Sequence, residues 1–257
     1  MGTDAWDPQC YERFRAERRE PYDDLVALIA VRPGLRVVDL GCGTGDLTAD
    51  LHRRLDAAET LGIDASARML AQAPADPGDG LRFRAGDVGA FADTGRWDVV
   101  FSNAALQWIP DHPALFARLR AALAPGGQLA VQMPANFDHP SHTAAAAVAA
   151  TPPFRDALVG PPRIRAVLPP EDYALLLDRL GAARQHVRLQ VYGHHLASRD
   201  EVVTWTRGTL LTDYERRLPP GLFTDFVAAY RARLTALLPD ERPFFFPFKR
   251  LLLWARF

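Results

Sequence analysis

The chain has 257 residues, of which 48% are hydrophobic and 24% are charged. A chain of this length can bury a core as one domain with an elaboration, and its apolar fraction is ordinary for a soluble globular protein. The formal net charge of −1 gives no basic footprint for nucleic acid, so we expect no nucleic-acid partner.

The cysteines and the apolar runs bear on the compartment. Cys10 and Cys42 have no spacing typical of a disulfide framework or a metal site, so they fit a reducing compartment and we expect no metal. The polar, charged N-terminus disfavours a signal peptide, and no apolar run approaches the ~20 residues of a membrane span. We therefore expect a cytoplasmic protein without membrane association, either a monomer or a weak homodimer.

The N-terminal segment predicts two helices. The first covers residues 4–20 and begins near Pro8, since proline is favoured in the first turn of a helix. The second covers residues 21–31. One face of the first helix, at spacings of three and four, carries Tyr11, Phe14, Arg15 and Arg18. These helices either only pack on the core or cover a bound ligand, and we predict a lid over residues 1–32.

Strand and helix patterns then alternate along residues 33–134. Short apolar runs rich in β-branched residues predict strands, and stretches with helical spacing follow them. The predicted elements cover residues 35–40, 46–56, 59–63, 66–74, 81–86, 97–102, 112–123 and 127–133. This alternation predicts a parallel, doubly wound α/β sheet that forms one ligand-binding core.

Three glycines follow the first predicted strand at alternate positions. Gly41, Gly43 and Gly45 lie between that strand and a predicted helix. Glycine tolerates positive φ and lets a ligand approach the backbone, and the first N–H groups of a helix have no partner inside it. A dinucleotide motif has a third small residue where Asp46 stands, so the spacing disfavours NAD. The loop predicts a small-molecule site at the carboxyl end of the sheet.

Polar residues stand at the ends of four predicted strands. They are Asp39, Asp64, Asp87 and Asn103. Each one alone is most simply a turn-forming residue. All four together line one edge of a parallel sheet, because the carboxyl ends of its strands meet there.

From residue 135 onward the composition changes, and prolines separate shorter elements. The predicted helices are an alanine-rich one that begins at Ser141 and His142, with either residue as its cap, one at 171–180 ended by Gly181, one at 202–211 capped by Ser198, and one at 221–237. The predicted strands of this part cover residues 187–196 and 248–256.

The loop and the strand ends together resemble those of class I S-adenosylmethionine (SAM)-dependent methyltransferases. The matching stretches are residues 38–45, 62–64, 86–88, 98–100 and 123–129. The resemblance implies a Rossmann-like seven-stranded sheet with an antiparallel last strand, SAM as the cofactor and S-adenosylhomocysteine as the product. It also implies that residues 135–257 supply the last two strands and a helical cap over the crevice.

The same resemblance implies the cofactor contacts. The backbone of Gly41, Cys42 and Gly43 would pack on the methionine part of SAM, with Asp39 beneath the loop. Asp64 would accept hydrogen bonds from the ribose hydroxyls, a bidentate role that suits a carboxylate. The remaining contacts would be Ala65 and Met69 beside the adenine, Asp87 on its exocyclic amine, the Val88 N–H on a ring nitrogen, and Asn103 near the methyl group.

Longer stretches resemble trans-aconitate 2-methyltransferases within this class. They are residues 6–8 with Tyr11, and residues 103–112, 131–142, 205–209 and 246–251. The resemblance implies esterification of a small polycarboxylic acid, although Arg207 interrupts the Trp/Gly/Thr pattern usual in this subgroup. Candidate partners of the acid are Tyr11, Arg15, Arg18, Gln107, Trp108, His142, Trp205, Arg207 and Arg250.

The implied reaction needs no general base. A carboxylate has a pKa near ~4, so it is ionised at neutral pH and attacks the sulfonium methyl directly. The enzyme then contributes alignment and exclusion of water, and alignment alone can lower the barrier by ~7–11 kcal/mol. We therefore expect no catalytic triad and assign no catalytic residue.

Several alternatives stay open at this stage. Trp108 and Trp205 fit a hydrophobic core as well as a pocket, and each arginine fits a solvated surface charge. The acceptor could be a carrier-linked carboxyl or another small molecule. An NAD-dependent oxidoreductase and a non-catalytic SAM-binding protein are the alternative classes, which the Asp46 mismatch and the intact polar strand ends disfavour.

Overall fold

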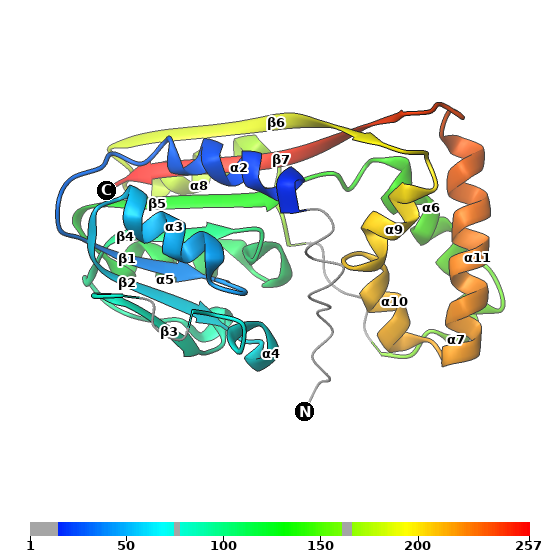
Figure 1. Ribbon diagram of the computed structural model, residues 1–257, viewed down its shortest axis with the longest axis horizontal. Helices are drawn as coiled ribbons and strands as arrows, with labels where there is room; N and C mark the ends of the chain where they lie inside the picture. Colours follow the sequence, from blue (N-terminus) through cyan, green and yellow to red (C-terminus); the bar gives the residue numbers. More distant parts are fainter. Residues whose placement is uncertain (1–14, 75–77, 161–165) are drawn as a thin grey trace. The chain divides into compact units, whose positions relative to one another are not determined.

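The computed structural model describes residues 15–74, 78–160 and 166–257, with side chains from Arg19 onward (Figure 1). The chain divides into two compact units. The sheet unit is built from residues 18–134, 164–190 and 250–257, and the helical unit mainly from residues 135–163 and 191–249. The long strands β6 (Arg184–Leu196) and β7 (Phe244–Arg256) each contribute residues to both units.

A seven-stranded sheet with the order β3-β2-β1-β4-β5-β7-β6 organises the sheet unit. Its other strands are β1 (Leu35–Leu40), β2 (Ala57–Asp64), β3 (Leu81–Ala85), β4 (Trp97–Asn103) and β5 (Leu123–Pro134). The pairs among β1 to β5 are parallel, and β7 is antiparallel to β5. The predicted doubly wound α/β fold with an antiparallel last strand is confirmed.

The central strands explain the apolar runs of the sequence. Val37 and Val38 on β1, and Val99 and Val100 on β4, have no exposed surface. They are covered on both faces of the sheet, as strands of a parallel sheet usually are. The chain passes from β1 to β2 and β3 on one side and returns to β4 on the other. This reversal places the loop after β1 at the switch point where ligands bind in such sheets.

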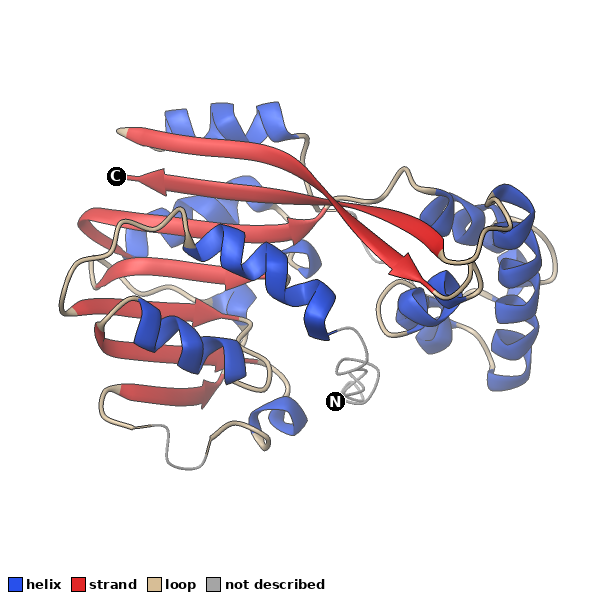
Figure 2. Ribbon diagram, turned by 45° about the horizontal axis from the view of Figure 1, so that its top comes forward, coloured by secondary structure: helices blue, strands red, loops and turns tan. Residues whose placement is uncertain are grey.

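Helices cover both faces of the sheet (Figures 1 and 2). α2 (Arg15–Val26) and α3 (Asp46–Arg54) lie on one face, and α5 (His112–Ala122) and α8 (Pro170–Arg179) lie on the other. Short elements follow the strands at their carboxyl ends: α4 (Ala67–Leu70), η1 (Val88–Ala90) and η2 (Leu106–Trp108). The loops of the candidate site are therefore attached to rigid elements.

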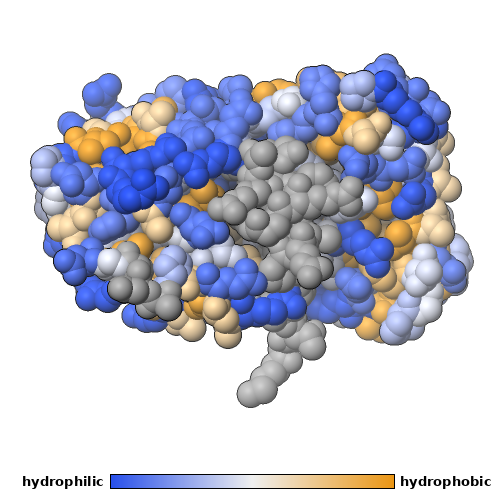
Figure 3. Space-filling model, viewed as in Figure 1, coloured by the Kyte–Doolittle hydropathy of each residue, from blue (hydrophilic) through white to orange (hydrophobic). Residues whose placement is uncertain are grey.

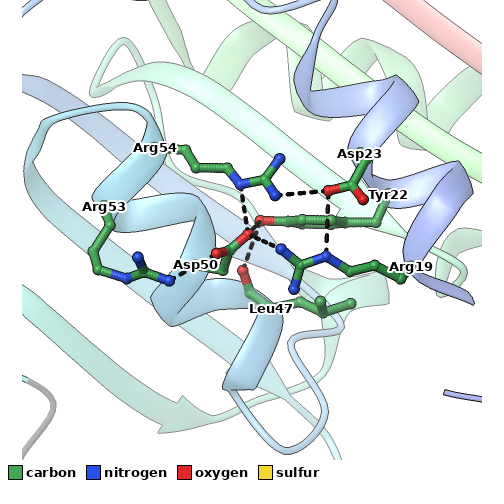
Figure 4. A network of polar contacts seen from close by, with 7 residues as sticks. All are labelled: Arg19, Tyr22, Asp23, Leu47, Asp50, Arg53 and Arg54. Atoms are coloured by element: carbon green, nitrogen blue, oxygen red, sulfur yellow. Dashed lines mark hydrogen bonds and ion pairs between the residues drawn. The ribbon is translucent and has the colours of Figure 1, made fainter. Parts of the chain in front are cut away.

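A buried carboxylate joins α2 to α3 (Figure 4). Asp50, 8% exposed, accepts hydrogen bonds from the Tyr22 hydroxyl at 3.1 Å and from Arg19 at 2.8 Å, and pairs with Arg54 at 2.7 Å. The Tyr22 hydroxyl also lies 3.0 Å from the Leu47 backbone oxygen. Burial, and then the Asp50 charge, raise the pKa of Tyr22, so its hydroxyl stays neutral. These contacts fix α3, whose N-terminus follows the glycine loop.

The helical unit has a core of its own. It is formed by α6 (Pro140–Ala149), α7 (Phe154–Ala157), α9 (Glu201–Arg207), α10 (Leu211–Arg217), α11 (Pro220–Leu237) and parts of β6 and β7. Phe226, Tyr230 and Phe246 are fully buried in this core. The Tyr230 hydroxyl donates to the Ser141 backbone oxygen at 3.0 Å and lies 3.1 Å from the Thr206 hydroxyl. Its polar end is therefore satisfied within the unit.

The predicted boundary between two N-terminal helices at residues 20 and 21 is wrong. α2 continues through Pro21, and residues 1–14 of the first predicted helix lie outside the described residues. A proline inside a helix costs about 3 kcal/mol because it lacks an N–H donor. Tyr22 and Leu25 follow it and are both fully buried, so packing of this turn outweighs the lost hydrogen bond.

The single helix predicted over residues 202–211 is also wrong. α9 ends at Arg207, Gly208 occupies its C-cap, and α10 begins at Leu211. Glycine is a poor helix former, which explains the break. Asp200, not Ser198, holds the N-cap position of α9, and the Glu201 carboxylate there accepts the Ala197 N–H at 3.0 Å. β6 and β7 also begin earlier than predicted.

The face shown in Figure 3 is hydrophilic over most of its described surface, with smaller hydrophobic areas between. The exposed large hydrophobic side chains include Leu175 on α8, Leu237 on α11, and Leu189 and Val191 on β6. In the parts of the chain that the structure describes, no helix combines the length and apolarity that crossing a membrane requires.

Candidate active site

The loop between β1 and α3 takes a conformation that its glycines permit. Gly41, Gly43 and Gly45 have φ angles of +87°, +57° and +79°, which L side chains rarely adopt. A Cβ on Gly41 would lie 2.1 Å from the Cβ of Ala105, on the segment after β4. The Gly41 N–H donates to the Ile63 oxygen on β2 at 2.8 Å. The loop backbone therefore lies directly against the ends of both neighbouring strands.

α3 begins after this loop with no side-chain cap. Gly45 is its N-cap residue, and its N–H donates to the Cys42 oxygen at 3.0 Å. The next N–H groups of the helix have no partner within it, and the helix dipole favours an anion there. Cys42 is a buried free thiol whose pKa burial raises, so it stays neutral. The loop thus offers backbone donors to a carboxylate.

Asp39 lies on β1 just before the loop and is 4% exposed. Its carboxylate accepts a hydrogen bond from the Thr48 hydroxyl on α3 at 2.5 Å. Burial raises the pKa of Asp39 to about 7, the Thr48 hydrogen bond opposes this rise, and the Asp64 charge adds to it. A cation placed nearby would favour the ionised form of Asp39.

Asp64 ends β2, and each of its carboxylate oxygens already accepts one backbone N–H. Oδ2 accepts from Gly43 at 2.8 Å, and Oδ1 accepts from Ser66 at 2.8 Å. A carboxylate has about four acceptor positions, so each oxygen keeps one for a ligand. The residue is partly exposed. This geometry suits two adjacent hydroxyl groups, as on a ribose.

Ala65 and Met69 follow Asp64. Ala65 is exposed, whereas Met69, on α4, is 4% exposed. The Met69 N–H donates to the Ser66 hydroxyl at 3.1 Å, which caps this short helix. The Met69 Cε would lie 3.4 Å from a Cβ on Gly43, so its thioether packs beside the loop.

Asp87 and Val88 form the turn after β3. Asp87 is exposed and caps η1 by accepting the Gly89 N–H at 2.8 Å with Oδ1. Val88 is 8% exposed. Arg118 on α5 donates to the Gly89 oxygen at 2.9 Å and fixes the turn from the other side. The turn presents one carboxylate oxygen and backbone N–H groups.

The segment between β4 and η2 adopts a conformation that is rare for alanine. Ala104 has a φ of +57°, and its N–H donates to the backbone oxygen of Gln132 on β5 at 2.9 Å. Gln107, 7% exposed, donates back to the Ala104 oxygen at 2.7 Å. Trp108 is partly buried beside it. These hydrogen bonds hold Asn103 and Ala105 at the end of β4.

η2 is also held by a buried histidine and tyrosine. His112 Nε2 lies 3.0 Å from the Leu106 oxygen, and His112 Nδ1 is hydrogen-bonded to the Tyr173 hydroxyl of α8. Burial lowers the pKa of His112, so its ring is neutral. Since a backbone oxygen only accepts, Nε2 carries the proton and Nδ1 accepts from Tyr173. This network anchors η2 on α5, which carries His112, and on α8, which carries Tyr173.

Gln132 links Asn103 to Arg250 across β4, β5 and β7. Its amide nitrogen faces the Asn103 Oδ1 at 2.7 Å, and its oxygen accepts from Arg250 Nη1 at 3.2 Å and from the Met133 N–H at 3.2 Å. The opposite orientation would set oxygen against oxygen and nitrogen against the guanidinium. Gln132 is fully buried and Arg250 is 4% exposed. The predicted cofactor residue Asn103 and the predicted acid-binding residue Arg250 are thus connected.

Two other predicted acid-binding residues, Trp205 and Arg207, belong to the helical unit. Trp205 is 7% exposed and stacks on His194 with ring centroids 5.1 Å apart. It also contacts Phe246 at 5.5 Å, so it forms part of the core of that unit. Arg207, at the end of α9, is exposed.

His142 also lies in the helical unit, but it does not cap α6. His139 holds the N-cap position and accepts the Ser141 N–H with Nδ1 at 3.1 Å. Burial lowers the pKa of His139 to about 4, which keeps this nitrogen free to accept. The α6 helix therefore begins at Pro140, before the predicted start. His142 Nδ1 lies 3.2 Å from the Ser141 hydroxyl.

Three predicted residues cannot be placed in this geometry. Tyr11 lies outside the described residues. Arg15 and Arg18 belong to α2, but their side chains lie outside the described part of the structure. Within the described residues, no cluster of histidine, cysteine, aspartate and glutamate has an arrangement that could hold a metal ion.

Sequence reasoning missed three residues of this site. Thr48 is read from the sequence as an ordinary helix residue, although it hydrogen-bonds Asp39. Ala105 is small where Gly41 approaches, and Gln132 lies in a strand whose apolar neighbours indicate burial. A polar residue inside a buried strand was the available signal, because buried polar groups require partners.

The residues at this edge of the sheet fit SAM. The loop between β1 and α3, called the Gly41 loop below, has no room for a Cβ at Gly41. The helix α3 begins after it without a side-chain cap, and Asp64 keeps acceptor positions for two hydroxyls. SAM has a carboxylate, a cationic centre and a ribose, which match the helix N-terminus, the acidic strand ends and Asp64 in turn.

Known proteins with similar sequences point the same way. A family described as "Methyltransferase domain" matches residues 37–127. The chain is 44% identical to a trans-aconitate 2-methyltransferase of Deinococcus radiodurans over 257 residues, 98% of each chain. It is 39% identical to a trans-aconitate 2-methyltransferase of Variovorax paradoxus over 235 residues, 91% of this chain and 90% of that one.

A solved structure shares the fold. Phosphoethanolamine N-methyltransferase 2 of Haemonchus contortus, in complex with SAM, matches with a TM-score of 0.56 at 18% identity. The match covers 93% of this chain and 52% of the other. The fold, the loop and these matches define a class I SAM-dependent methyltransferase with SAM as its cofactor. Within that class, the chain belongs to the trans-aconitate 2-methyltransferase family and acts on a small molecule.

Proposed function

We propose that this methyltransferase esterifies one carboxylate of a small polycarboxylic acid, and that the acid is trans-aconitate. The observation that carries the proposal is the likeness, over 98% of both chains, to a protein named trans-aconitate 2-methyltransferase. That likeness extends well beyond residues 37–127, so it includes the helical unit as well as the glycine loop.

The acceptor in this reaction is its own nucleophile. A carboxylate with a pKa near ~4 is ionised at neutral pH, so no residue has to remove a proton. SAM, when bound, supplies an electrophilic methyl carbon on a sulfonium, which the carboxylate oxygen takes as the carbon–sulfur bond breaks. The products are a methyl ester and neutral S-adenosylhomocysteine. The protein contributes alignment and exclusion of water, and no catalytic residue is assigned.

The sheet unit supplies the groups that would hold the cofactor. The Asp64 carboxylate, with its two remaining acceptor positions, would bind the ribose hydroxyls. The Gly41 loop and the start of α3 would take the methionine part, and Asp39 would lie beneath them. Ala65 and Met69 would lie beside the adenine, with Asp87 and the Val88 N–H on its polar edge. Asn103 would lie near the transferred methyl group.

The acid requires positive partners, because a buried carboxylate without one costs several kcal/mol. Arg250 fits this role within the sheet unit, since it is buried and connected through Gln132 to the end of β4. Gln107 and Trp108 lie on the segment that follows. The roles of Tyr11, Arg15, Arg18, His142, Trp205 and Arg207 toward the acid stay predictions, as do the lid and cap.

We further propose that the protein works in the cytoplasm as a monomer or weak homodimer. The free thiol of Cys42 supports the compartment alone, since it fits reducing conditions. Sedimentation equilibrium across a hundredfold concentration range tests the oligomeric part of this proposal, and a stable dimer at low concentration would contradict it.

A turnover screen tests the proposed reaction. The enzyme is incubated with methyl-labelled SAM and, separately, with trans-aconitate, cis-aconitate, isocitrate, a phenol and an amine. We expect label transfer to trans-aconitate first and to the related acids more slowly. A reaction without enzyme serves as the control for non-enzymatic transfer. Transfer to the phenol or amine with none to any acid would overturn the proposal while leaving the methyltransferase assignment intact.

A further inference from the structure

Gln132 holds the end of β4 in two ways. On β5 it pairs with Asn103 on one side and with Leu252 of β7 on the other. Its backbone oxygen accepts the Ala104 N–H at 2.9 Å, and its side-chain amide reaches the Asn103 side chain. Gln132 has no exposed surface. A fully buried glutamine with both ends paired is rigid, so it can fix the orientation of its neighbours.

The direction of the hydrogen bonds through Gln132 is set by Arg250. A guanidinium only donates, so the Gln132 oxygen must face it, at 3.2 Å. The Gln132 nitrogen then faces Asn103 and donates to its Oδ1 at 2.7 Å. An asparagine amide has its oxygen and nitrogen at opposite ends. Asn103 is therefore held with its NH2 group directed away from Gln132, at the last position of β4.

We infer that Gln132 is a positioning residue that keeps the NH2 group of Asn103 directed at the methyl acceptor, and thereby selects an ionised carboxylate. The inference rests on the proposed function, which supplies the acid. A carboxylate only accepts hydrogen bonds, so it pairs with the NH2 end of an amide and is repelled by the oxygen end. Arg250 strengthens this donor, because each hydrogen bond in a chain polarises the next.

The orientation of Asn103 assigns it to the acid and not to the cationic part of the cofactor. A sulfonium or ammonium group is stabilised by acceptors, and the neighbouring strand ends supply these as Asp39 and Asp64. The methionine carboxylate has the uncapped start of α3. The donor end of Asn103 remains for the anionic reactant.

Two substitutions at Gln132 separate positioning from simple packing. In Gln132→Glu the carboxylate still accepts from Arg250 but donates nothing, so the Asn103 NH2 group turns toward it and the Asn103 oxygen meets the acid. In Gln132→Leu, Asn103 loses its partner but is free to turn its NH2 group to the acid. If Gln132 only fills space, Gln132→Glu, which has the same shape, should raise the KM for the acid less than Gln132→Leu does. If Gln132 positions Asn103, Gln132→Glu should raise this KM more than Gln132→Leu does.

Gln128 provides a matched control on the same strand. It is 4% exposed, and its amide bonds the Ala30 backbone at 2.8 and 2.9 Å and accepts from Trp254 at 3.1 Å. Gln128→Glu therefore buries a carboxylate in β5 away from Asn103. It should lower the stability of the protein and leave the KM for the acid unchanged.

The experiment measures steady-state turnover of trans-aconitate together with calorimetric SAM affinity. We expect Gln132→Glu to raise the KM for the acid by about 10–100-fold, more than Gln132→Leu does, with the Kd of SAM changed by less than about twofold. An equal or smaller KM effect of Glu than of Leu would overturn the inference. So would a loss of SAM affinity without a change in KM, which would assign the donor to the cofactor.

A spectroscopic readout distinguishes this inference from the proposed function. With 15N-asparagine labelling and S-adenosylhomocysteine bound, adding trans-aconitate should shift the Asn103 side-chain NH2 signal in the wild type but not in Gln132→Glu. A shift in both proteins contradicts the positioning role while the acid still binds. If the wild type neither shifts nor transfers methyl to any acid, the proposed acceptor is wrong and the inference falls with it.

Discussion

The ends of β1, β2 and β3 carry carboxylates, whereas the end of β4 and its neighbours on β5 and β7 carry two amides and a guanidinium. On the first side, Asp39 and Asp64 accept hydrogen bonds from a hydroxyl and from backbone N–H groups. On the second, Arg250 donates to Gln132 and Gln132 donates to Asn103. One side of the carboxyl edge therefore concentrates acceptors, and the other is directed as a chain of donors.

This difference matches the charges of SAM and of the proposed acid. A sulfonium cofactor is stabilised beside acceptors and negative charge, and a carboxylate acid beside donors and positive charge. The proposed methyl transfer consumes one unit of each charge, because its products are a neutral thioether and an ester. An edge divided in this way aligns two oppositely charged groups without supplying a base. The predictions below test the acceptor side and the donor side separately.

The largest effect is expected where the loop backbone meets the segment after β4. In Gly41→Ala the new Cβ would lie 2.1 Å from the Ala105 Cβ, at a φ of +87°. Strain and overlap together should cost about 2–5 kcal/mol of unfolding free energy and abolish measurable SAM binding. Urea unfolding and calorimetry measure the two effects.

Gly126→Ala is the matched control for that substitution. Gly126 also has a positive φ, +76°, but a Cβ there meets nothing within 4 Å. It should cost only the conformational strain of about 1–2 kcal/mol and leave SAM affinity unchanged. Equal effects of the two substitutions would mean that the close approach to Ala105 does not matter for the site.

The next effect is on the acceptor side alone. Asp64→Asn replaces one acceptor oxygen by an NH2 group that must face the Gly43 or the Ser66 N–H. We expect the Kd of SAM to rise about 10–100-fold, since hydrogen bonds to a charged group are lost. Glu59→Gln, on the same strand but paired with Arg82 and Arg96, should leave the Kd unchanged. An unaltered SAM affinity in Asp64→Asn is incompatible with the proposed ribose contact.

The donor side should respond through the acid and not through SAM. Arg250→Met removes the buried guanidinium, and we expect the KM for trans-aconitate to rise about tenfold or more with SAM affinity retained. Arg256→Met, an exposed position on the same strand, is the control. Arg207→Ala should have a smaller effect, because exposed charges contribute less. If neither Arg250→Met nor Arg207→Ala changes the KM for trans-aconitate, the acid binds elsewhere.

The smallest effect concerns the pH dependence of stability. The pKa of Asp39 is about 7 when folded, above its ordinary 3.8, so the folded protein holds this proton more tightly than the unfolded chain. Its stabilising contribution is full below about pH 3.8 and is lost as the pH rises through about 7. Urea unfolding of the SAM-free protein should show this loss between about pH 4 and 7, and Asp39→Asn should lack it.

Thr48→Val sharpens the pH experiment. The Thr48 hydroxyl stabilises the ionised form of Asp39, so its removal should raise the folded pKa further and extend the loss of stability to higher pH. Parallel stability curves for the wild type, Asp39→Asn and Thr48→Val would show that Asp39 does not titrate in this range.

Local sequence was sufficient to predict the acceptor side. Its patterns are only a few residues long, so they can be recognised in the sequence. They are the β-branched run at residues 35–40, the glycines after it and the aspartates at the strand ends. The fold class followed from the alternation of strands and helices. α2 differs because burial of Tyr22 and Leu25, a tertiary effect, overrides Pro21.

The donor side depends on contacts that a local pattern does not contain. Asn103, Gln132 and Arg250 lie far apart in the sequence and meet only because β4, β5 and β7 are neighbours. Without the strand order, Gln132 is only one polar residue in an apolar strand, and its partners cannot be identified. The direction of its amide follows only once Arg250 is known to face it.

The most direct test of the central claim is the identity of the bond that the enzyme forms. The wild-type enzyme is given trans-aconitate and SAM with a 13C-labelled methyl group, and the product is examined by carbon NMR. We predict a single labelled O-methyl ester carbon, which alkaline hydrolysis releases as labelled methanol. Label on a carbon or nitrogen atom, or no transfer to the acid while another acceptor is methylated, would contradict the account.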